Sequence, residues 1–135
     1  MNILIIDAQG GGIGRALVAA VRKELPEAQV TAVGTNSAAT SAMLKAGAQH
    51  AATGENAVRV CCRTADIILG PIGMVIADSL LGEITPAMAL SISRSRAKRI
   101  LIPVNHCENV VAGVCDLSTG ALVESAMREL HRLLP

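Results

Sequence analysis

The feature that most constrains this chain is Asn2–Arg15, where an apolar run leads into a glycine-rich turn and then into a helical pattern. Ile3–Ile6 is short and wholly aliphatic, as expected of a strand that is buried on both faces. Asp7 ends this run, and helical periodicity then extends from Ile13 to Leu25. A strand, a glycine turn and a helix in this order present backbone N–H groups and a helix N-terminus to a phosphate.

The remainder of the chain alternates strand-like and helix-like segments. Further strands are expected at Gln29–Val33, Gln49–Ala52, Ile67–Leu69 and Ile100–Val104, with Val110–Val114 as a candidate antiparallel edge strand. Further helices are expected at Ala38–Ala46, Ala57–Arg63, Pro86–Ser93 and from Ser118 or Thr119 to about Leu134. Met74–Gly82 is open between a helix and a loop with a helical turn. The alternation predicts a single α/β domain over residues 1–135, a Rossmann-like three-layer αβα fold with a mostly parallel sheet of about five strands.

Ligands of such a sheet bind beyond the carboxyl ends of its strands. The loops expected at that edge are rich in Gly, Asn, Thr and other small polar residues, whereas the strands are almost wholly aliphatic. These loops are Asp7–Gly14, Gly34–Ser37, Thr53–Asn56, Gly70–Gly73 and Asn105–Cys107. Their composition predicts a binding site at the carboxyl edge of the sheet.

The glycine turn is the first candidate for phosphate binding. It does not fit the G-x-G-x-x-G fingerprint, because one register places Arg15 and the other Gln9 at a glycine position. Four glycines exceed what one tight turn requires, which favours an anion or nucleotide site over a purely conformational turn. In this interpretation Asp7 and Gln9 shape the turn. The phosphate is held by Gly10, Gly11, Gly12, Ile13 and Gly14.

The other candidate residues lie in the loops that follow the next strands. Thr35 and Asn36 either contact a ribose or a second phosphate, or cap the helix that follows them. No acid and no arginine stands at the end of the second strand, so NAD, NADP and a mononucleotide all remain open as ligands. Gly54, Glu55 and Asn56 would approach the base, and Gly70, Pro71 and Gly73 either line the crevice or form a rigid turn. Glu83 and Thr85 are weaker candidates, and Glu83 is expected to be a solvated carboxylate.

Ile3–Ala16 resembles the nucleotide-binding end of the short-chain dehydrogenases, mainly through Gly12-Ile13-Gly14. That family uses a tyrosine as its catalytic base, and this chain contains no tyrosine. The resemblance therefore implies nucleotide binding without the family's proton-transfer machinery, and whether the protein is an enzyme stays open.

Composition excludes several classes of partner. The chain has no Phe, Tyr or Trp, so it cannot stack the bases of a single-stranded nucleic acid on aromatic rings. Its net charge of +1 predicts no strong attraction to nucleic acid or to a membrane surface, and Arg94–Arg99 is interpreted as a solvated helix end and loop. The longest apolar run, Ile67–Ala77, is too short to span a bilayer. With no recognisable signal peptide, a cytoplasmic location is expected.

The cysteines and histidines indicate no metal site. Cys61, Cys62, Cys107 and Cys115 form no C-x-x-C pair and are expected to be reduced and mostly buried. His106 and Cys107 could form a soft-metal site with Cys61, Cys62 or His50, but the paired ligand spacing of such sites is missing. A Cys107 nucleophile with His106 as its base is disfavoured, because neighbours on an extended segment point apart.

A second resemblance extends from Asn2 to about Val104. The blocks IDAQGGGIG, GTNSAATSAMLKAGA, ATGEN, IILGPIGM and LGEITPAMA, in this order, resemble an uncharacterised family of small stand-alone Rossmann-like bacterial proteins. The resemblance implies an NAD(P)-binding type of fold and a bacterial cytoplasmic origin, and it implies no activity.

Three functional hypotheses follow from these observations. The first is a binding protein that holds a nucleotide or dinucleotide, as a sensor or as a subunit of an assembly. The second is a minimal NAD(P)-dependent oxidoreductase or another nucleotide-dependent enzyme, with a pocket completed across a homodimer by Met74–Leu90. The third is a protein-interaction module without a ligand. The apolar Met74–Leu90 segment also predicts a homodimer in its own right.

Overall fold

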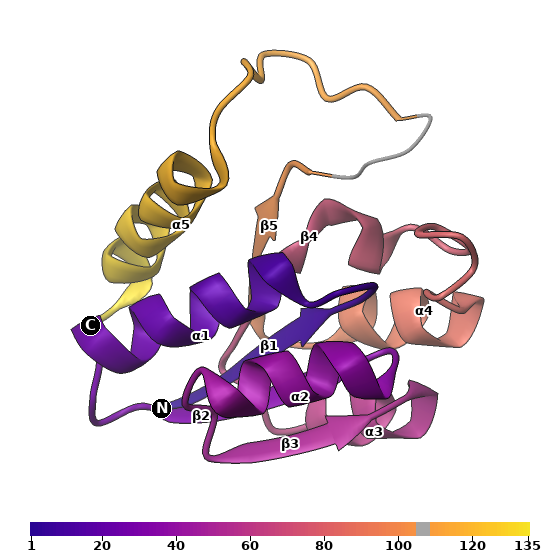
Figure 1. Ribbon diagram of the computed structural model, residues 1–135, viewed down its shortest axis with the longest axis horizontal. Coiled ribbons are helices and arrows are strands. Elements are labelled where there is room, and N and C mark those ends of the chain that lie inside the picture. The colour runs from indigo at the N-terminus through magenta and orange to yellow at the C-terminus, as the bar shows by residue number, and fades with distance from the viewer. Residues whose placement is uncertain (105–108) are drawn as a thin grey trace.

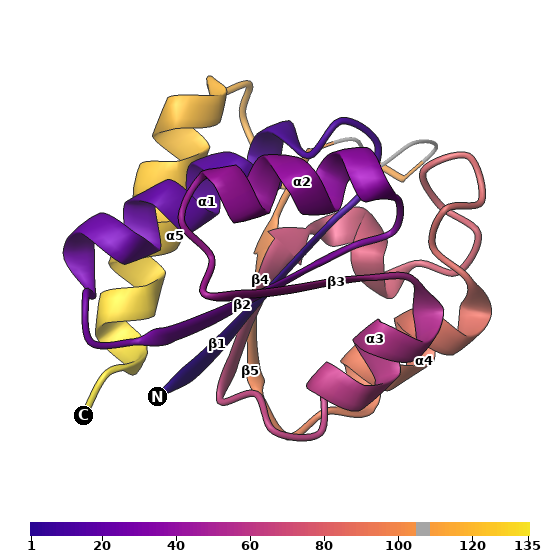
Figure 2. The same ribbon diagram turned by 60° about the horizontal axis from the view of Figure 1, so that its bottom comes forward.

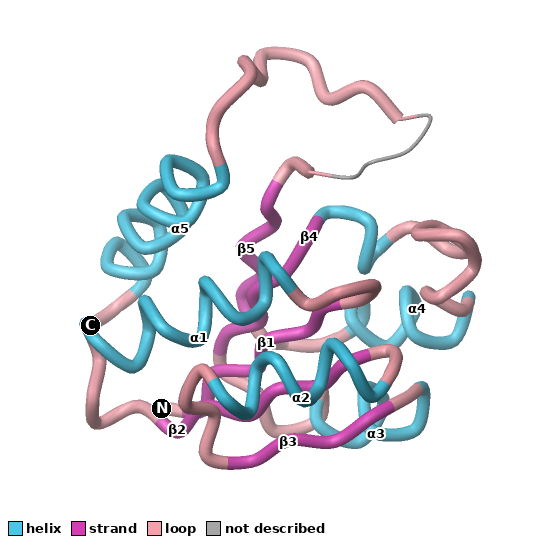
Figure 3. Tube along the Cα trace, viewed as in Figure 1, coloured by secondary structure: helices cyan, strands magenta, loops and turns pink. Residues whose placement is uncertain are grey.

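The computed structural model describes residues 1–104 and 109–135, and these residues contain a parallel five-stranded sheet (Figures 1 and 3). The strands are β1 (Asn2–Asp7), β2 (Gln29–Gly34), β3 (His50–Thr53), β4 (Ile67–Pro71) and β5 (Lys98–Ile102). Their spatial order is β3-β2-β1-β4-β5, and every neighbouring pair is parallel. From β1 the strands follow one another outward to β3, and the chain then crosses back to place β4 on the other side of β1. The direction of winding therefore changes between β1 and β4, which is the topological switch point of the sheet.

Helices cover both faces of the sheet, which makes the fold a Rossmann-like three-layer αβα arrangement (Figure 2). One face carries α1 (Gly12–Glu24), α2 (Ser37–Lys45) and α5 (Thr119–Leu133), and the other carries α3 (Glu55–Cys61) and α4 (Pro86–Arg94). A short 3-10 helix, η1 (Ile72–Val75), follows β4. No helix in the described parts of the chain has the length and apolar character needed to cross a membrane.

The central strand β1 contributes side chains to the core on both faces of the sheet. Ile3 and Ile5 pack into the cluster beneath α1, α2 and α5, and Leu4 and Ile6 pack into the cluster beneath α3 and α4. Side chains of a strand alternate between its two faces, so a strand covered by helices on both faces must be apolar at consecutive positions. This explains the unbroken aliphatic run in the sequence.

The expected antiparallel strand at Val110–Val114 is wrong. This segment contains no strand, and Val110 is 92% exposed. Gly113 has a positive φ of 83°, so the chain turns within the segment, and Figure 1 shows residues 109–118 extending away from the sheet. An extended run needs a partner strand to satisfy its backbone groups, and none of the described strands pairs with this segment.

Several element bounds differ from the expected ones by a few residues, and local causes explain β5 and the segment after η1. β5 runs over Lys98–Ile102 rather than Ile100–Val104, because Pro103 has no N–H to donate to a strand ladder. In Met74–Gly82 the alternative of a loop with a helical turn is confirmed, since only the end of η1 is helical there. Loop residues Asp78, Leu80 and Leu81 all have positive φ angles, which a continuous helix does not allow.

Candidate functional site

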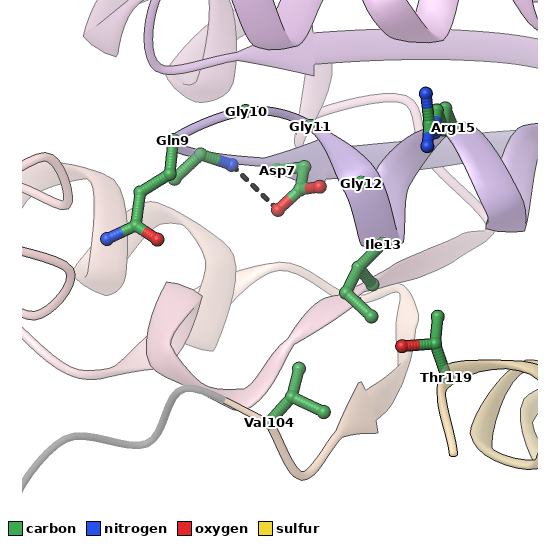
Figure 4. A pocket seen from close by; sticks show the side chains of 10 residues that line it. Asp7, Gln9, Gly10, Gly11, Gly12, Ile13, Arg15, Val104 and Thr119 are labelled. Carbon is green, nitrogen blue, oxygen red and sulfur yellow. Dashed lines mark hydrogen bonds between the residues drawn. The ribbon is translucent and has the colours of Figure 1, made fainter.

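An open cavity of about 470 Å³ lies at the carboxyl edge of the sheet, at the start of α1 (Figure 4). Its walls come from the loop between β1 and α1, from the segment after β5 and from the start of α5. Figure 4 shows Ile13, Val104 and Thr119 around the open space. The lining residues are Asp7, Ala8, Gln9, Gly10, Gly11, Gly12, Ile13, Arg15, Val104 and Thr119.

Two of the four glycines in the turn are required by packing. A Cβ atom on Gly11 would lie 2.8 Å from the Cα of Ala39 in α2, and Gly11 also has a positive φ of 74°. A Cβ atom on Gly14 would lie 2.7 Å from the Cβ of Asp7 and 2.6 Å from the sulfur of Met43. These glycines let α1 approach β1 and α2 closely, so they need no ligand to explain them.

The other two glycines of the turn have no such requirement. A Cβ atom on Gly10 or on Gly12 would meet no atom within 4 Å, and neither residue has a positive φ. Both line the cavity. A side chain at either position would extend into open space, so the absence of one keeps backbone accessible beside the cavity.

The backbone around Gly10 and Gly12 also offers hydrogen-bond donors. Among the described residues, the N–H groups of Gly10, Gly12 and Ile13 have no hydrogen-bond partner. Gly12 and Ile13 are the first two residues of α1, where the helix itself supplies no acceptor. Together with the positive end of the helix dipole, these donors make an environment that favours a negatively charged group.

Asp7 is a buried carboxylate at the base of the turn. Its Oδ1 accepts a hydrogen bond of 2.8 Å from the Ala8 amide, and its Oδ2 accepts one of 2.6 Å from the Gly14 amide. Burial raises the pKa of Asp7, the two amide bonds oppose this, and the charge of Glu83 adds to the increase. Asp7 thus connects both ends of the turn through its two carboxylate oxygens.

Glu83 makes more contacts at this edge than the solvated carboxylate that the sequence predicts. Its Oε1 accepts hydrogen bonds from the Gln9 amide (3.0 Å), the Thr35 hydroxyl (2.7 Å) and the Asn36 side-chain amide (2.7 Å). Burial alone would raise the pKa of Glu83, but these bonds outweigh it and hold the pKa below its usual value. No local pattern could have indicated this role, because the partners are contributed by two distant loops.

Thr35 and Asn36 therefore face Glu83 at the end of β2. Asn36 also caps α2, since its Oδ1 accepts a hydrogen bond of 2.9 Å from the Ala39 amide. The helix-capping interpretation is confirmed for Asn36, while Thr35 has its bond to Glu83. Neither residue lines the cavity at the glycine turn, but Gln9, which does, connects the two regions through its bond to Glu83.

The remaining candidates do not converge on the cavity. Gly54 precedes α3 with a positive φ of 100°, and Glu55 accepts a hydrogen bond of 2.5 Å from the Thr85 hydroxyl. Asn56 is exposed on the first turn of α3. These residues tie the start of α3 to the start of α4 and stand apart from the glycine turn.

Gly70, Pro71 and Gly73 are buried, and the two glycines are held in place by close packing. A Cβ atom on Gly70 would lie 2.4 Å from the Ile6 carbonyl oxygen. A Cβ atom on Gly73 would lie 3.2 Å from the Ser79 hydroxyl. Of the two interpretations offered by the sequence, these contacts favour the rigid turn.

In the part of the chain that the structure describes, the cysteines form no catalytic or metal-binding group. Burial raises the pKa of Cys62 to about 11, and the neighbouring Cys61 adds to this, which disfavours the nucleophilic thiolate form. Cys115 is exposed, contrary to the expectation of mostly buried cysteines. The described residues contain no group of three or more His, Cys, Asp or Glu side chains that could hold a metal. The proposals for Asn105–Cys107, including His106 and Cys107, lie outside the described residues.

Comparisons with known proteins address the fold and the family. A family model described as a domain of unknown function, DUF3842, matches residues 2–135. No curated protein matches the chain in sequence. A dodecameric FMN-dependent UbiX-like decarboxylase from Escherichia coli O157:H7 is similar in structure, with 18% identity and a TM-score of 0.45 over 96% of this chain and 75% of that chain. An NADPH-dependent quinone oxidoreductase from Escherichia coli has 13% identity and a TM-score of 0.41 over 73% of this chain and 46% of that chain.

Proposed function

This chain belongs to the DUF3842 family, a family of unknown function, and we propose from the site itself that the protein binds a nucleotide or dinucleotide. The ligand's phosphate would lie at the glycine turn, at the carboxyl edge of the sheet. The observation that carries this proposal is the pair Gly10 and Gly12, which no packing contact and no φ angle requires and which line the cavity.

The accessible amides of Gly12 and Ile13 would donate to phosphate oxygens at the N-terminus of α1. Arg15 supplies a cation among the residues around the cavity. Asp7 is the acidic residue of the lining, and both of its carboxylate oxygens already accept hydrogen bonds from backbone amides of the turn. The residues present therefore fit a phosphate group.

The position of Glu83 favours NAD, whose ribose has free hydroxyl groups, over NADP, whose ribose carries a 2′-phosphate. Many dinucleotide-binding folds hold the ribose with an acid at the end of the second strand, and this chain lacks one there in sequence. Glu83 brings a carboxylate to Thr35 and Asn36 from another loop. Its Oε2 has no partner among the described residues and can accept from a hydroxyl, whereas a phosphate would be repelled.

The proposal is tested by isothermal titration calorimetry with NAD, NADP, ATP and AMP on the wild-type protein and on Gly12→Val. We expect NAD to bind more tightly than NADP. We expect Gly12→Val to abolish binding, because its side chain would extend into the cavity without disturbing the packing of the turn. Glu83→Gln should narrow the difference between NAD and NADP, because it removes the charge that repels a 2′-phosphate.

Gly120→Val is the matched control, because Gly120 also stands at the start of a helix with open space around it and does not line the cavity. Binding that survives in folded Gly12→Val would place the ligand elsewhere. A chain that binds none of these nucleotides would contradict the proposal and favour the interaction module.

A further inference from the structure

Four arginine side chains surround a second cavity, of about 330 Å³, which lies at the opposite edge of the sheet from the glycine turn. They come from two segments that are distant in sequence, at the C-terminal ends of α3 and α4, and Figure 2 shows these helices side by side on one face of the sheet. The four are Arg59, Arg63, Arg94 and Arg96, and the cavity is completed by Cys62, Ser91 and Ser95.

These arginines have no acidic partner in the described part of the chain. The ion pairs found there join His131 to Glu24 and Arg132 to Glu129, both remote from this cavity. The four guanidinium groups also make no hydrogen bonds to described residues. Four like charges around one concavity repel one another, and no described acid offsets them, so an anion bound there would be favourable.

Arg99 lies in the same region but differs from the four arginines, because its guanidinium group is hydrogen-bonded within the chain. Its guanidinium donates to the carbonyl oxygens of Ile92 (3.4 Å), Ser95 (2.8 Å) and Ala97 (3.1 Å), and so caps the end of α4. Arg99 is exposed, as expected of a solvated helix end, and it has a structural role as well. Arg94 and Arg96, in contrast, have none of these bonds.

Helix dipoles do not account for the group. Arg59 and Arg94 lie in the last turns of α3 and α4, where a cation is favourable. Arg63 and Arg96 lie beyond the ends of these helices, where that effect falls off.

The floor of the cavity is held in a fixed arrangement by polar contacts. The Ser95 hydroxyl donates to the Cys62 carbonyl oxygen over 2.9 Å and accepts from the Ala97 amide over 3.1 Å. These bonds link the end of α3 to the end of α4 directly, so the arginines are carried by a rigid base.

We propose that this arginine cavity binds a small molecule with a multiply charged phosphate group, such as a di- or triphosphate. Arginine presents a planar fork of donors that matches phosphate oxygens in pairs, and several such forks neutralise several charges. A nucleic acid fits less well, because the charges are confined to a concavity, the chain has a net charge of only +1 and it has no aromatic side chain on which bases could stack. The site is separate from the proposed nucleotide site and does not depend on it.

The test uses inorganic tripolyphosphate, which has no base or ribose, and isothermal titration calorimetry on the full chain carrying Gly12→Val. This background removes the first proposed site, so that failure at one site is not mistaken for failure at the other. We expect saturable binding that becomes at least tenfold weaker in Arg63→Gln/Arg94→Gln and weakens with added salt. The matched control is Lys23→Gln/Arg128→Gln, which removes the same charge from exposed positions on α1 and α5 and should bind as before.

ATP and a short duplex DNA are the other arms of the experiment. Binding of ATP that also weakens in the arginine variant supports the proposal and indicates that the phosphate is carried by a nucleotide. Three results would overturn it: no binding of tripolyphosphate, equal weakening in both double variants, or binding of DNA alone. Because all four arginines are exposed, the variants should keep the wild-type melting temperature, and Arg96→Gln alone provides a second, milder test.

Discussion

Glu83 is the single residue that most alters the chemistry of the carboxyl edge. One carboxylate oxygen collects hydrogen bonds from a backbone amide, a hydroxyl and a side-chain amide, and these donors come from the ends of β1 and β2. Such bonds stabilise the charged form of the acid. Glu83 therefore joins the η1–α4 loop to the glycine turn and places a negative charge where the ends of β1 and β2 meet.

The lowered pKa of Glu83 predicts a specific pH dependence. Its stabilising contribution is fully present above the usual value of 4.5 and is lost as the pH falls through the lower pKa of the folded state. Glu83→Gln lacks this contribution, so its free energy of unfolding should fall less steeply than that of the wild type between about pH 5 and about pH 3. Urea unfolding at a series of pH values measures the difference.

Asp7 acts with the opposite sign, since its raised pKa makes stability fall as the pH rises above its usual value of 3.8. Asp7 is present in both proteins, so most of its effect cancels in the comparison. Glu124→Gln, on the exposed side of α5, serves as the control for removing a glutamate charge. Parallel curves for the wild type and Glu83→Gln would contradict the prediction.

At the scale of the elements, α5 shows how a helix is docked by one face. Leu122, Ala126 and Leu130 recur at helical spacing and are buried, whereas Leu133, which continues the same spacing, is 42% exposed. Val123 and Met127 complete the buried side against α1 and β5. Leu133 is the last residue of the helix, where the chain leaves the surface it packs on.

Two leucine variants of α5 should therefore differ in stability. Leu130→Ala removes a fully buried side chain and should lower the free energy of unfolding by about 2–5 kcal/mol. Leu133→Ala, the same substitution one turn along, should change it by less than about 1 kcal/mol because the side chain is half exposed. Chemical denaturation measures both, and equal losses would mean that α5 is docked differently.

At the scale of the whole molecule, the proposed homodimer rests on fewer exposed apolar groups than the sequence indicated. Within Met74–Leu90 the side chains of Met74, Leu80, Ile84 and Met88 are buried in this chain's own core. Leu81, at 96% exposed, and Leu90, at 48%, remain available to a partner. Leu81 also has a positive φ of 59°, so an unfavourable backbone conformation presents an apolar side chain outward.

We expect size-exclusion chromatography with light scattering to give twice the chain mass at micromolar concentration. Leu81→Ser/Leu90→Ser should shift the protein to a monomer, because it removes the apolar groups available for association. Leu44→Ser, at a half-exposed position on α2, is the control that should leave the dimer intact. A wild-type protein that elutes as a monomer would contradict the prediction.

Local patterns in the sequence predict the fold class and the positions of the five strands and of most helices. The aliphatic run of β1, the glycine turn, the Thr85-Pro86 start of α4 and the periodicity of α5 are local signals that span a few residues each. Alternation of such elements leaves few topologies open, because parallel strands need crossovers of a fixed hand. The part of the candidate site that lies within one loop, from Asp7 to Gly14, was predictable for the same reason.

The tertiary fold sets which glycines are free of packing contacts, which acid reaches the end of β2, and where the arginines meet. Glu83 and Thr35 are 48 residues apart, and the two arginine pairs come from different helices. Such contacts depend on strand order and on how closely the helices pack, which are properties of the assembled chain. No local pattern records them, because each member of a contact looks ordinary beside its own neighbours in sequence.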